Sequence, residues 1–370
     1  VYKRQGRGMM KYISEYRDRQ VIDRLAGQIA SFRDTKAVFM EVCGTHTMSI
    51  HRFDIPSLLP AGLRLLSGPG CPVCVTPVGY MDHAIALARQ GKHIIATFGD
   101  LVRVPGSTST LEKARAEGAD VRTVYSITEA LELARTHPGR KVIFLAIGFE
   151  TTAPATAAGV LQAQKEQLRN FCILSAHKVM PPALEMLASE GVKIDGYLCP
   201  GHVSVITGEE IYRFIPRKYG VGCVIAGFEP ADILLAILLL LKQVTDGKPR
   251  VENAYKRAVR KEGNPKAREM MESVFRPVDT EWRGLGMVKK SGLVLREEFA
   301  SMDAAGQIRV MVEPPVEPQG CICGQILKGI AAPSDCPLFG KMCHPGNPVG
   351  ACMVSSEGTC QNAFKFQSDG

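Results

Sequence analysis

Short apolar runs alternate with helical patterns of apolar residues from about residue 37 to residue 230. Most runs are rich in apolar and β-branched residues, as expected of strands whose two faces are both covered. The expected strands are Ala37–Val42, Leu63–Ser67, His93–Phe98, Arg122–Tyr125, Lys141–Ile147, Phe171–Ser175, Gly196–Leu198 and Cys223–Ala226. The helical patterns between them are Met81–Arg89, Leu111–Glu117, Thr128–Thr136, Ala155–Leu168 and Ala183–Ser189. This alternation predicts an α/β fold with parallel sheets.

The same pattern predicts how the chain is divided. The run Val142–Ile147, with a glycine-rich turn and a long helix after it, reads as the start of a second α/β unit. We therefore expect an N-terminal extension and helix over residues 1–36 and two Rossmann-like parallel α/β domains over residues 37–140 and 141–230. Residues 231–370 are expected to form a mainly helical or irregular, cysteine-rich domain, beginning with an apolar helix at Ala231–Lys242. Its last part, Cys321–Cys360, has little periodicity and can stay ordered if a metal cross-links it.

Composition and charge narrow the function classes. The net charge of +8 is spread along the chain and only 6% of residues are aromatic, so we expect no nucleic-acid partner. The longest apolar run, Ile233–Leu241, is shorter than the ~20 residues that span a bilayer, so we expect no membrane segment. No signal peptide is recognisable, and Val1–Gly8 reads as an upstream extension. Twelve cysteines without an export signal indicate metal or redox chemistry in the cytoplasm.

The first candidate site is Glu41-Val-Cys43-Gly-Thr-His46-Thr47, which follows an expected strand. Ligands of open α/β sheets bind outside the carboxyl ends of the strands, so this loop is well placed for function. A thiol and an imidazole three residues apart can share a metal, or the imidazole can lower the pKa of the thiol. A buried structural Cys43 beside an N-capping threonine is an equally good interpretation of this motif alone.

The second candidate site is Gly68-Pro-Gly-Cys71-Pro-Val-Cys74, which also follows an expected strand. Two thiols separated by two residues can form a reversible disulfide or chelate a soft metal. Two unrelated core cysteines are the weaker interpretation. Together the two loops supply three thiolates and one imidazole from adjacent strands.

Other strand ends carry polar residues that suit chemistry. Asp100, Glu150, His202 and Glu229 each follow an expected strand, as does the Ser175–Lys178 segment, and most of these strand ends lie beside a glycine. Each alone is explained by helix capping, because Asp and Thr accept backbone N–H bonds and Pro begins helices. Their repetition predicts one cleft between the two α/β halves. None of the loops has the glycine spacing of a nucleotide-binding motif.

The third candidate site is the C-terminal tail. Cys321, Cys336, Cys343 and Cys360 are separated by 14, 6 and 16 residues, wider than the two-to-four-residue knuckles of structural zinc sites. Wide loops and a cysteine before proline favour an iron–sulfur cluster with four cysteine ligands, and zinc is the competing metal. The sequence leaves open whether Cys321 or Cys323 is the first ligand. Cys323 and Cys352 are the expected spare thiols, and Glu357 is either a group supporting the site or an exposed turn residue.

These motifs together closely resemble the hydrogenase maturation factor HypD family. The resemblance covers about residues 37–366 and rests on the ordered set Cys43-Gly-Thr-His-Thr, Gly-Pro-Gly-Cys71-Pro-Val-Cys74, Gly-Phe-Glu150-Thr-Thr-Ala-Pro, Pro-Gly-His202-Val, Gly-Phe-Glu229-Pro and the spaced C-terminal cysteines. It implies a cytoplasmic scaffold that assembles and transfers the Fe(CN)2CO group of [NiFe] hydrogenases, with a HypC-like chaperone, a HypE-like cyanide donor and, indirectly, the hydrogenase large subunit.

The resemblance also implies residue roles. Cys43 would bind the iron with His46 nearby, Cys71 and Cys74 would form a redox dithiol, and a [4Fe-4S] cluster would be held by Cys321, Cys336, Cys343 and Cys360. Thiolate is a suitable soft ligand for such iron, and cluster and dithiol can supply electrons. Asp100, Glu150, His202 and Glu229 are expected to position or protonate the incoming group.

Two other functions compete with the assembly scaffold. An iron–sulfur thiol–disulfide reductase would need Cys71 and Cys74 but not Cys43. A zinc-stabilised α/β binding protein without redox chemistry would be colourless. On the scaffold interpretation the chain promotes a redox step without being an ordinary turnover enzyme.

Overall fold

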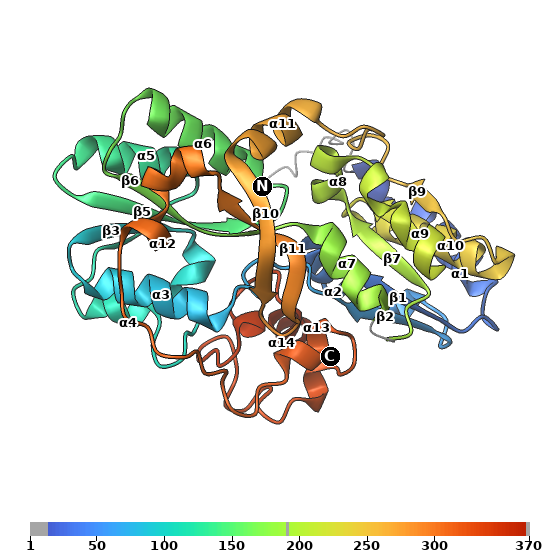
Figure 1. Cartoon of the computed structure of the whole chain (residues 1–370). Helices are drawn as coiled ribbons and strands as arrows, with labels where there is room; N and C mark the ends of the chain where they lie inside the picture. The colour runs from blue at the N-terminus through green and yellow to red at the C-terminus, as the bar shows by residue number, and fades with distance from the viewer. Residues whose placement is uncertain (1–13, 190–191, 368–370) are drawn as a thin grey trace, which may run out of the picture.

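The computed structural model describes residues 14–189 and 192–367 of the chain. It is an α/β structure built on two sheets with helices on their faces, with the cysteine-rich tail packed below them in the view of Figure 1. This confirms the expected α/β class with two mostly parallel sheets. The expected extension Val1–Gly8 lies outside the described residues.

The first sheet has five strands in the order β2-β1-β7-β8-β9, and all its neighbours are parallel. Its strands are β1 (Ala37–Glu41), β2 (Leu63–Ser67), β7 (Gly196–Pro200), β8 (Gly222–Ala226) and β9 (Val251–Asn253). The side chains of β7 and β8 are buried throughout. This burial explains why these strands show as short continuous runs in the sequence.

The second sheet has six strands in the order β10-β11-β6-β5-β3-β4. The strands β3 (His93–Thr97), β4 (Val121–Thr123), β5 (Lys141–Gly148) and β6 (Phe171–Lys178) are parallel to one another. An antiparallel hairpin of β10 (Phe275–Trp282) and β11 (Gly286–Leu295) extends the edge at β6. The sequence pattern predicted no hairpin here, because most residues of β10 are exposed or half-buried and give no apolar run.

The chain passes between the sheets three times. Residues 37–67 and 196–253 supply the first sheet, and residues 93–178 and 275–295 supply the second. The expected boundary at residues 137–140 therefore falls between β4 and β5, which belong to the same sheet. Apolar runs of buried parallel strands look alike, so their order in the sequence does not say which sheet each one joins.

The helices cover both sheets and connect their strands. They are α1 (Arg19–Ala30), α2 (Gly44–Arg52), α3 (Val78–Arg89), α4 (Leu111–Ala116), α5 (Ile127–Thr136), α6 (Ala153–Lys165), α7 (Met180–Ser189), α8 (Gly201–Thr207), α9 (Phe214–Tyr219), α10 (Pro230–Asp246), α11 (Pro265–Val274), α12 (Ala304–Gln307), α13 (Cys323–Leu327) and α14 (Thr359–Gln367). The apolar α10 starts at a proline and ends at Gly247 in the left-handed conformation, a favourable start and stop. No helix of the described chain has the length and apolarity needed to cross a bilayer.

The cysteine-rich tail is mostly irregular and folds back onto the start of the chain. Short helical turns, among them α13 and the 3-10 turn η7 (Ala351–Met353), precede α14, and α14 packs against α2. Figure 1 shows α13 and α14 below the β10–β11 hairpin and beside α2. This packing places the last cysteines next to the loops that carry the first ones.

One lysine of the second sheet is buried with no carboxylate partner among the described residues. The Lys178 side chain is 2% exposed, its Nζ donates to the Glu281 carbonyl oxygen at 2.7 Å, and it lies 5.4 Å from the centre of the Trp282 ring. Burial lowers the pKa of Lys178 to about 7, with a smaller opposing effect of the Glu281 charge. The ammonium form is therefore costly to keep inside the fold.

Replacing Lys178 with methionine is expected to stabilise the protein by a few kcal/mol below pH 7, since each pKa unit is worth about 1.4 kcal/mol. The unfolded lysine keeps its proton up to its ordinary pKa of 10.5, whereas the folded one loses it near 7. The wild type therefore gains stability as pH rises from 7 to 10.5, and the advantage of Lys178→Met shrinks over that range. Urea unfolding at several pH values measures this, with Lys289→Met as the exposed control. Parallel pH profiles of wild type and Lys178→Met would contradict it.

Candidate functional site

Four of the predicted motifs meet at one edge of the first sheet. The loops after β1, β2, β7 and β8 carry Cys43, the Cys71–Cys74 pair, His202 and Glu229, and these strands are neighbours in the sheet. The carboxyl ends of parallel strands lie at the same edge, so the loops are side by side. Asp100 and Glu150 follow β3 and β5 and belong to the second sheet.

The Cys43 loop and the Cys71 loop are in backbone contact. The Gly44 N–H donates to the Gly70 carbonyl oxygen at 3.1 Å, and the Gly68 N–H donates to the Glu41 carbonyl oxygen at 2.8 Å. A Cβ atom on Gly70 would lie 2.2 Å from the Cys43 nitrogen and 2.4 Å from its Cα. Only glycine allows this approach, which explains a glycine directly before Cys71.

Cys43 is a buried thiol at the start of α2. Its backbone N–H donates to Glu41 Oε2 at 2.9 Å, and the Thr47 hydroxyl donates to the other Glu41 oxygen. Burial and the nearby Glu357 and Glu41 carboxyls raise the pKa of Cys43 to about 12, against the backbone N–H groups of His46 and Thr45, which favour the thiolate. Burial also raises the pKa of Glu41 to about 7. Sequence reasoning gave Glu41 no role, although it stands in the motif two residues before the thiol.

The His46 imidazole is fully buried and neutral. Its Nε2 lies 2.9 Å from the Gly227 carbonyl oxygen, so Nε2 carries the hydrogen and donates it. Its Nδ1 is buried and has no hydrogen-bond partner in the described chain. Burial lowers the pKa of His46 to about 4, so a charged imidazole lowering the pKa of Cys43 does not fit this geometry. A neutral imidazole with a free nitrogen is the form that ligates metals.

Phe228, which precedes Glu229 in its motif, contacts residues of two other motifs, His46 and His202. Its ring lies 4.9 Å from the His46 ring and 4.0 Å from the His202 ring, with which it is stacked. Glu229 pairs with Arg17 of the 3-10 turn η1 (Ser14–Arg17), with Oε1 2.9 Å from Nη2, and caps α10. Sequence reasoning quoted Phe228 within its motif but gave it no role, because an aromatic residue in a loop carries no chemistry by itself.

The tail covers the Cys43 loop. The Thr45 hydroxyl donates to Glu357 Oε1 at 2.7 Å, and a Cβ atom on Gly44 would lie 2.4 Å from the Glu357 Cβ. The Ser355 hydroxyl donates to Asp100 Oδ2 at 2.9 Å. Glu357 is therefore no exposed turn residue, and burial raises its pKa with a further contribution from the Asp100 charge. Asp100 is therefore connected to the Cys43 loop indirectly, through the tail loop that carries Ser355 and Glu357.

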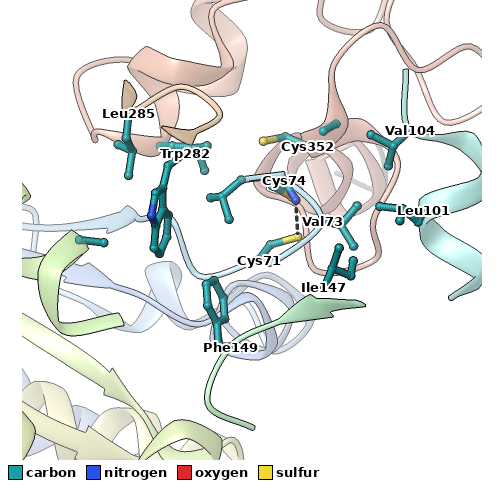
Figure 2. Close-up of a cluster of buried hydrophobic side chains, with 14 of the residues drawn as sticks. Cys71, Val73, Cys74, Leu101, Val104, Ile147, Phe149, Trp282, Leu285 and Cys352 are labelled. Carbon is teal, nitrogen blue, oxygen red and sulfur yellow. Dashed lines mark hydrogen bonds between the residues drawn. The ribbon is translucent and has the colours of Figure 1, made fainter. Parts of the chain in front are cut away.

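Glu150 lies apart from the Cys43 loop. It is 2% exposed, its Oε1 accepts the Met180 N–H at 3.0 Å, and its Oε2 is buried without a hydrogen-bond partner in the described chain. Burial raises the pKa of Glu150 to about 7. The preceding Phe149 stacks on Trp282 with ring centres 5.7 Å apart. Figure 2 shows both rings beside the loop of Cys71 and Cys74.

The two thiols of the Cys71–Cys74 pair lie close to each other and to a third cysteine. The Cys74 N–H donates to Cys71 Sγ at 3.2 Å, and Cys352 lies next to this loop in Figure 2. Burial raises the pKa of Cys74, as do the Cys352 and Cys71 thiols. Hydrogen bonds from the Cys323 and Cys74 thiols lower the pKa of Cys352. Cys352 thus contacts the dithiol on one side and Cys323 on the other, and none of the described cysteines forms a disulfide.

Five cysteines of the tail line one apolar cavity. They are Cys321, Cys323, Cys336, Cys343 and Cys360, and Ile326, Leu338, Phe339, Gly350 and Met353 complete the wall. Cys321 Sγ and Cys323 Sγ are 3.1 Å apart, and the Val349 N–H donates to Cys343 Sγ at 3.4 Å. A Cβ atom on Gly350 would lie within 2.8 Å of both the Cys321 and the Cys323 sulfur.

The cysteine-lined cavity is compatible with a metal cluster. Within the described residues, no three His, Cys, Asp or Glu side chains are grouped closely enough to hold one metal ion. The cysteine ligands of an iron–sulfur cluster stand farther apart, because the cluster itself occupies the space between them. Four or more cysteines around an apolar space, with a backbone N–H on one sulfur, are the donor set of such clusters.

Comparisons with known proteins cover almost the whole chain. The HypD family model, described as "Hydrogenase formation hypA family", matches residues 19–367. A hydrogenase maturation factor HypD of Azotobacter vinelandii is 47% identical over 367 residues, which cover 96% of this chain and 97% of the relative. A putative hydrogenase expression/formation protein of Methanocaldococcus jannaschii is 45% identical over 352 residues, covering 95% and 98%. A HypD of Cupriavidus necator is 45% identical over 369 residues, covering 96% and 97%.

Proposed function

Because the chain belongs to the HypD family of hydrogenase maturation factors, we propose that it assembles the Fe(CN)2CO group with Cys43 as the iron ligand. In this proposal the iron is cargo, held while its cyanide and CO ligands are attached and then passed on. The partners are a HypC-like chaperone, a HypE-like cyanide donor and, indirectly, the hydrogenase large subunit. The chain acts in the cytoplasm, without nucleic acid or membrane.

The observation that carries the proposal is the environment of Cys43. Its thiol sits at the N-terminus of α2, where the backbone N–H groups of Thr45 and His46 face it. Such N–H groups and the helix dipole stabilise a thiolate. Burial opposes ionisation when no cation is present, so an arriving iron would displace the proton and compensate the thiolate charge. The free Nδ1 of the neutral His46 is the second donor of this loop.

The tail would supply the electrons for the assembly. In our proposal Cys321, Cys336, Cys343 and Cys360 hold a [4Fe-4S] cluster, which transfers one electron at a time. Oxidation of the Cys71 and Cys74 thiols to a disulfide releases two electrons and two protons, and two electrons with two protons restore the thiols. Cys352 contacts Cys323 of the cavity wall and Cys74 of the dithiol, and it would connect the two.

The remaining polar residues would transfer protons or hold neighbouring groups in position. The pKa of about 7 would let Glu150 take up or release a proton at neutral pH. His202 is an exposed imidazole stacked on Phe228, so it would meet an incoming group first. Asp100 and Glu229 would act by holding the tail loop and the start of α10 through their bonds to Ser355 and Arg17.

A thiol–disulfide reductase is the second candidate. The observation that favours it is the contact of Cys352 with both Cys74 and Cys323, which would serve disulfide reduction equally well. A reductase would not require the Cys43 loop. Maturation that persists in Cys43→Ala but fails in Cys71→Ala would favour it.

An infrared spectrum of the anaerobically purified chain with its small chaperone tests the proposal. We expect bands in the CN and CO stretching region in the wild type and in Cys172→Ala, a buried cysteine outside both sites. The bands should be lost in Cys43→Ala, because no thiolate remains to hold the iron. Bands that persist in Cys43→Ala would remove Cys43 from the iron, and their absence from a cluster-loaded, chaperone-bound wild type would favour the reductase.

A further inference from the structure

The turn between β10 and β11 is wedged between the dithiol loop and the tail. The Arg283 N–H donates to the Val75 carbonyl oxygen at 2.9 Å, directly after Cys74. A Cβ atom on Gly284 would lie 2.7 Å from the Cα of Gly324, which follows Cys323. Figure 2 shows the neighbouring Trp282 beside the loop that carries Cys71 and Cys74. The turn therefore touches the dithiol loop and the cluster cavity wall at once.

Arg283 brings a buried positive charge into this turn. Its side chain is 3% exposed, its Nε donates to Glu317 Oε2 at 3.1 Å and its Nη1 donates to the Pro105 carbonyl oxygen at 3.2 Å. Nη2 is also 3.1 Å from Glu317 Oε2 but makes no hydrogen bond with any described residue. Arginine cannot lose its proton, so buried N–H donors are left without an acceptor, at a cost in stability.

The carboxylate partner of Arg283 compensates this charge only in part. The Glu317 side chain is 57% exposed, so water screens its charge, whereas the guanidinium is enclosed. Glu317, which accepts the Arg283 N–H, stands four positions before Cys321, and Gly284 contacts Gly324, which follows Cys323. Arg283 therefore lies beside the segment that carries Cys321 and Cys323.

We propose that Arg283 is a positioning residue that stabilises the reduced state of the cluster in the tail cavity. The inference rests on the proposed function, because it needs the cluster that the cysteines would hold. A cluster with four thiolate ligands is anionic and gains one further negative charge when it accepts one electron, with no bond made or broken. A buried cation with unused N–H donors lowers the free energy of that reduced state and raises the reduction potential. The bond to Val75 keeps the dithiol loop beside the same turn.

Anaerobic redox titration of the loaded full-length protein tests this, using dithionite and mediator dyes with visible absorption and electron paramagnetic resonance as readouts. Arg283→Gln removes the charge but keeps a donor, and we expect an about tenfold lower ratio of reduced to oxidised cluster at a fixed potential. For a one-electron couple this corresponds to a midpoint about 59 mV lower. Arg283→Lys keeps the charge and should stay near the wild type.

Glu317→Gln supplies a test with the opposite sign. It removes an exposed counter-charge and leaves Arg283 in place, so the midpoint should rise. This variant also decides the matter if Arg283→Gln does not retain its cluster, and a midpoint that stays or falls then overturns the inference. A loaded wild type whose midpoint is unchanged in Arg283→Gln overturns the inference alone. A wild type that binds no cluster overturns the inference together with the cluster assignment.

Discussion

Replacing Gly70 with alanine is expected to separate the two N-terminal thiol loops and to abolish iron binding at Cys43. The added methyl group would lie 2.2 Å from the Cys43 nitrogen, 2.4 Å from its Cα and 2.5 Å from the Val42 carbonyl carbon. All three are backbone atoms, so no side-chain rotation relieves the clash and one loop must move. We expect the free energy of unfolding to fall by about 3 kcal/mol and the CN and CO bands to be lost.

Gly27→Ala is the matched control for this prediction. Gly27 lies on the exposed side of α1, and a methyl group there would meet open space, so alanine should stabilise the helix by about 1 kcal/mol. Urea unfolding and the infrared spectrum measure both variants. A Gly70→Ala protein with wild-type stability and intact bands would show that the loops tolerate separation and that their contact does not hold Cys43.

The elements of the sheets were readable from the sequence, but their arrangement was not. Strands such as Lys141–Gly148 are buried on both faces, so they stand out as apolar runs. The β10–β11 hairpin did not stand out, because it lies at a sheet edge and exposes much of its surface. The passage of the chain between the two sheets depends on packing of helices and strands far apart in sequence, which no local pattern records.

Part of the candidate site was also predictable from the sequence, and part was not. The loops after β1, β2, β7 and β8 were predictable, because function in α/β sheets gathers at the carboxyl ends of strands. The contact of Thr45 with Glu357 spans 312 positions and that of Asp100 with Ser355 spans 255. Such contacts follow from the fold of the tail, so the sequence left the place of Glu357 open. The position of Cys352 between the dithiol and the cavity was undetermined for the same reason.

The tail explains why these distant residues meet. It has little regular structure of its own, yet it packs its α14 on α2 and holds the loop at Glu357 over Cys43. Apolar side chains such as Leu327 and Met353 anchor it in the main core, and the proposed cluster would cross-link it further. Loss of the proposed cluster would therefore disturb the Cys43 loop as well as the cavity.

Replacing Cys343 or Cys360 with alanine is accordingly expected to remove the cluster completely. Both are buried cysteines in the wall of the tail cavity, and a four-cysteine cluster loses its closed ligand set with either one. Iron analysis and visible absorption of the anaerobic protein should show loss of the brown colour, and the tail should unfold at a lower temperature.

Cys352, which we propose is not a cluster ligand, supplies the control, since it lies outside the cavity wall. Cys352→Ala should keep its iron and colour while slowing the transfer of electrons between the cluster and the Cys71–Cys74 pair.

The same measurements on Cys321→Ala and Cys323→Ala show which of these two cysteines is a cluster ligand, because only the ligand variant should lose the cluster. Full iron content in both Cys343→Ala and Cys360→Ala would exclude the four-cysteine assignment. A colourless wild type containing zinc would replace the cluster with a structural metal, and the electrons for assembly would then have to come from the dithiol alone.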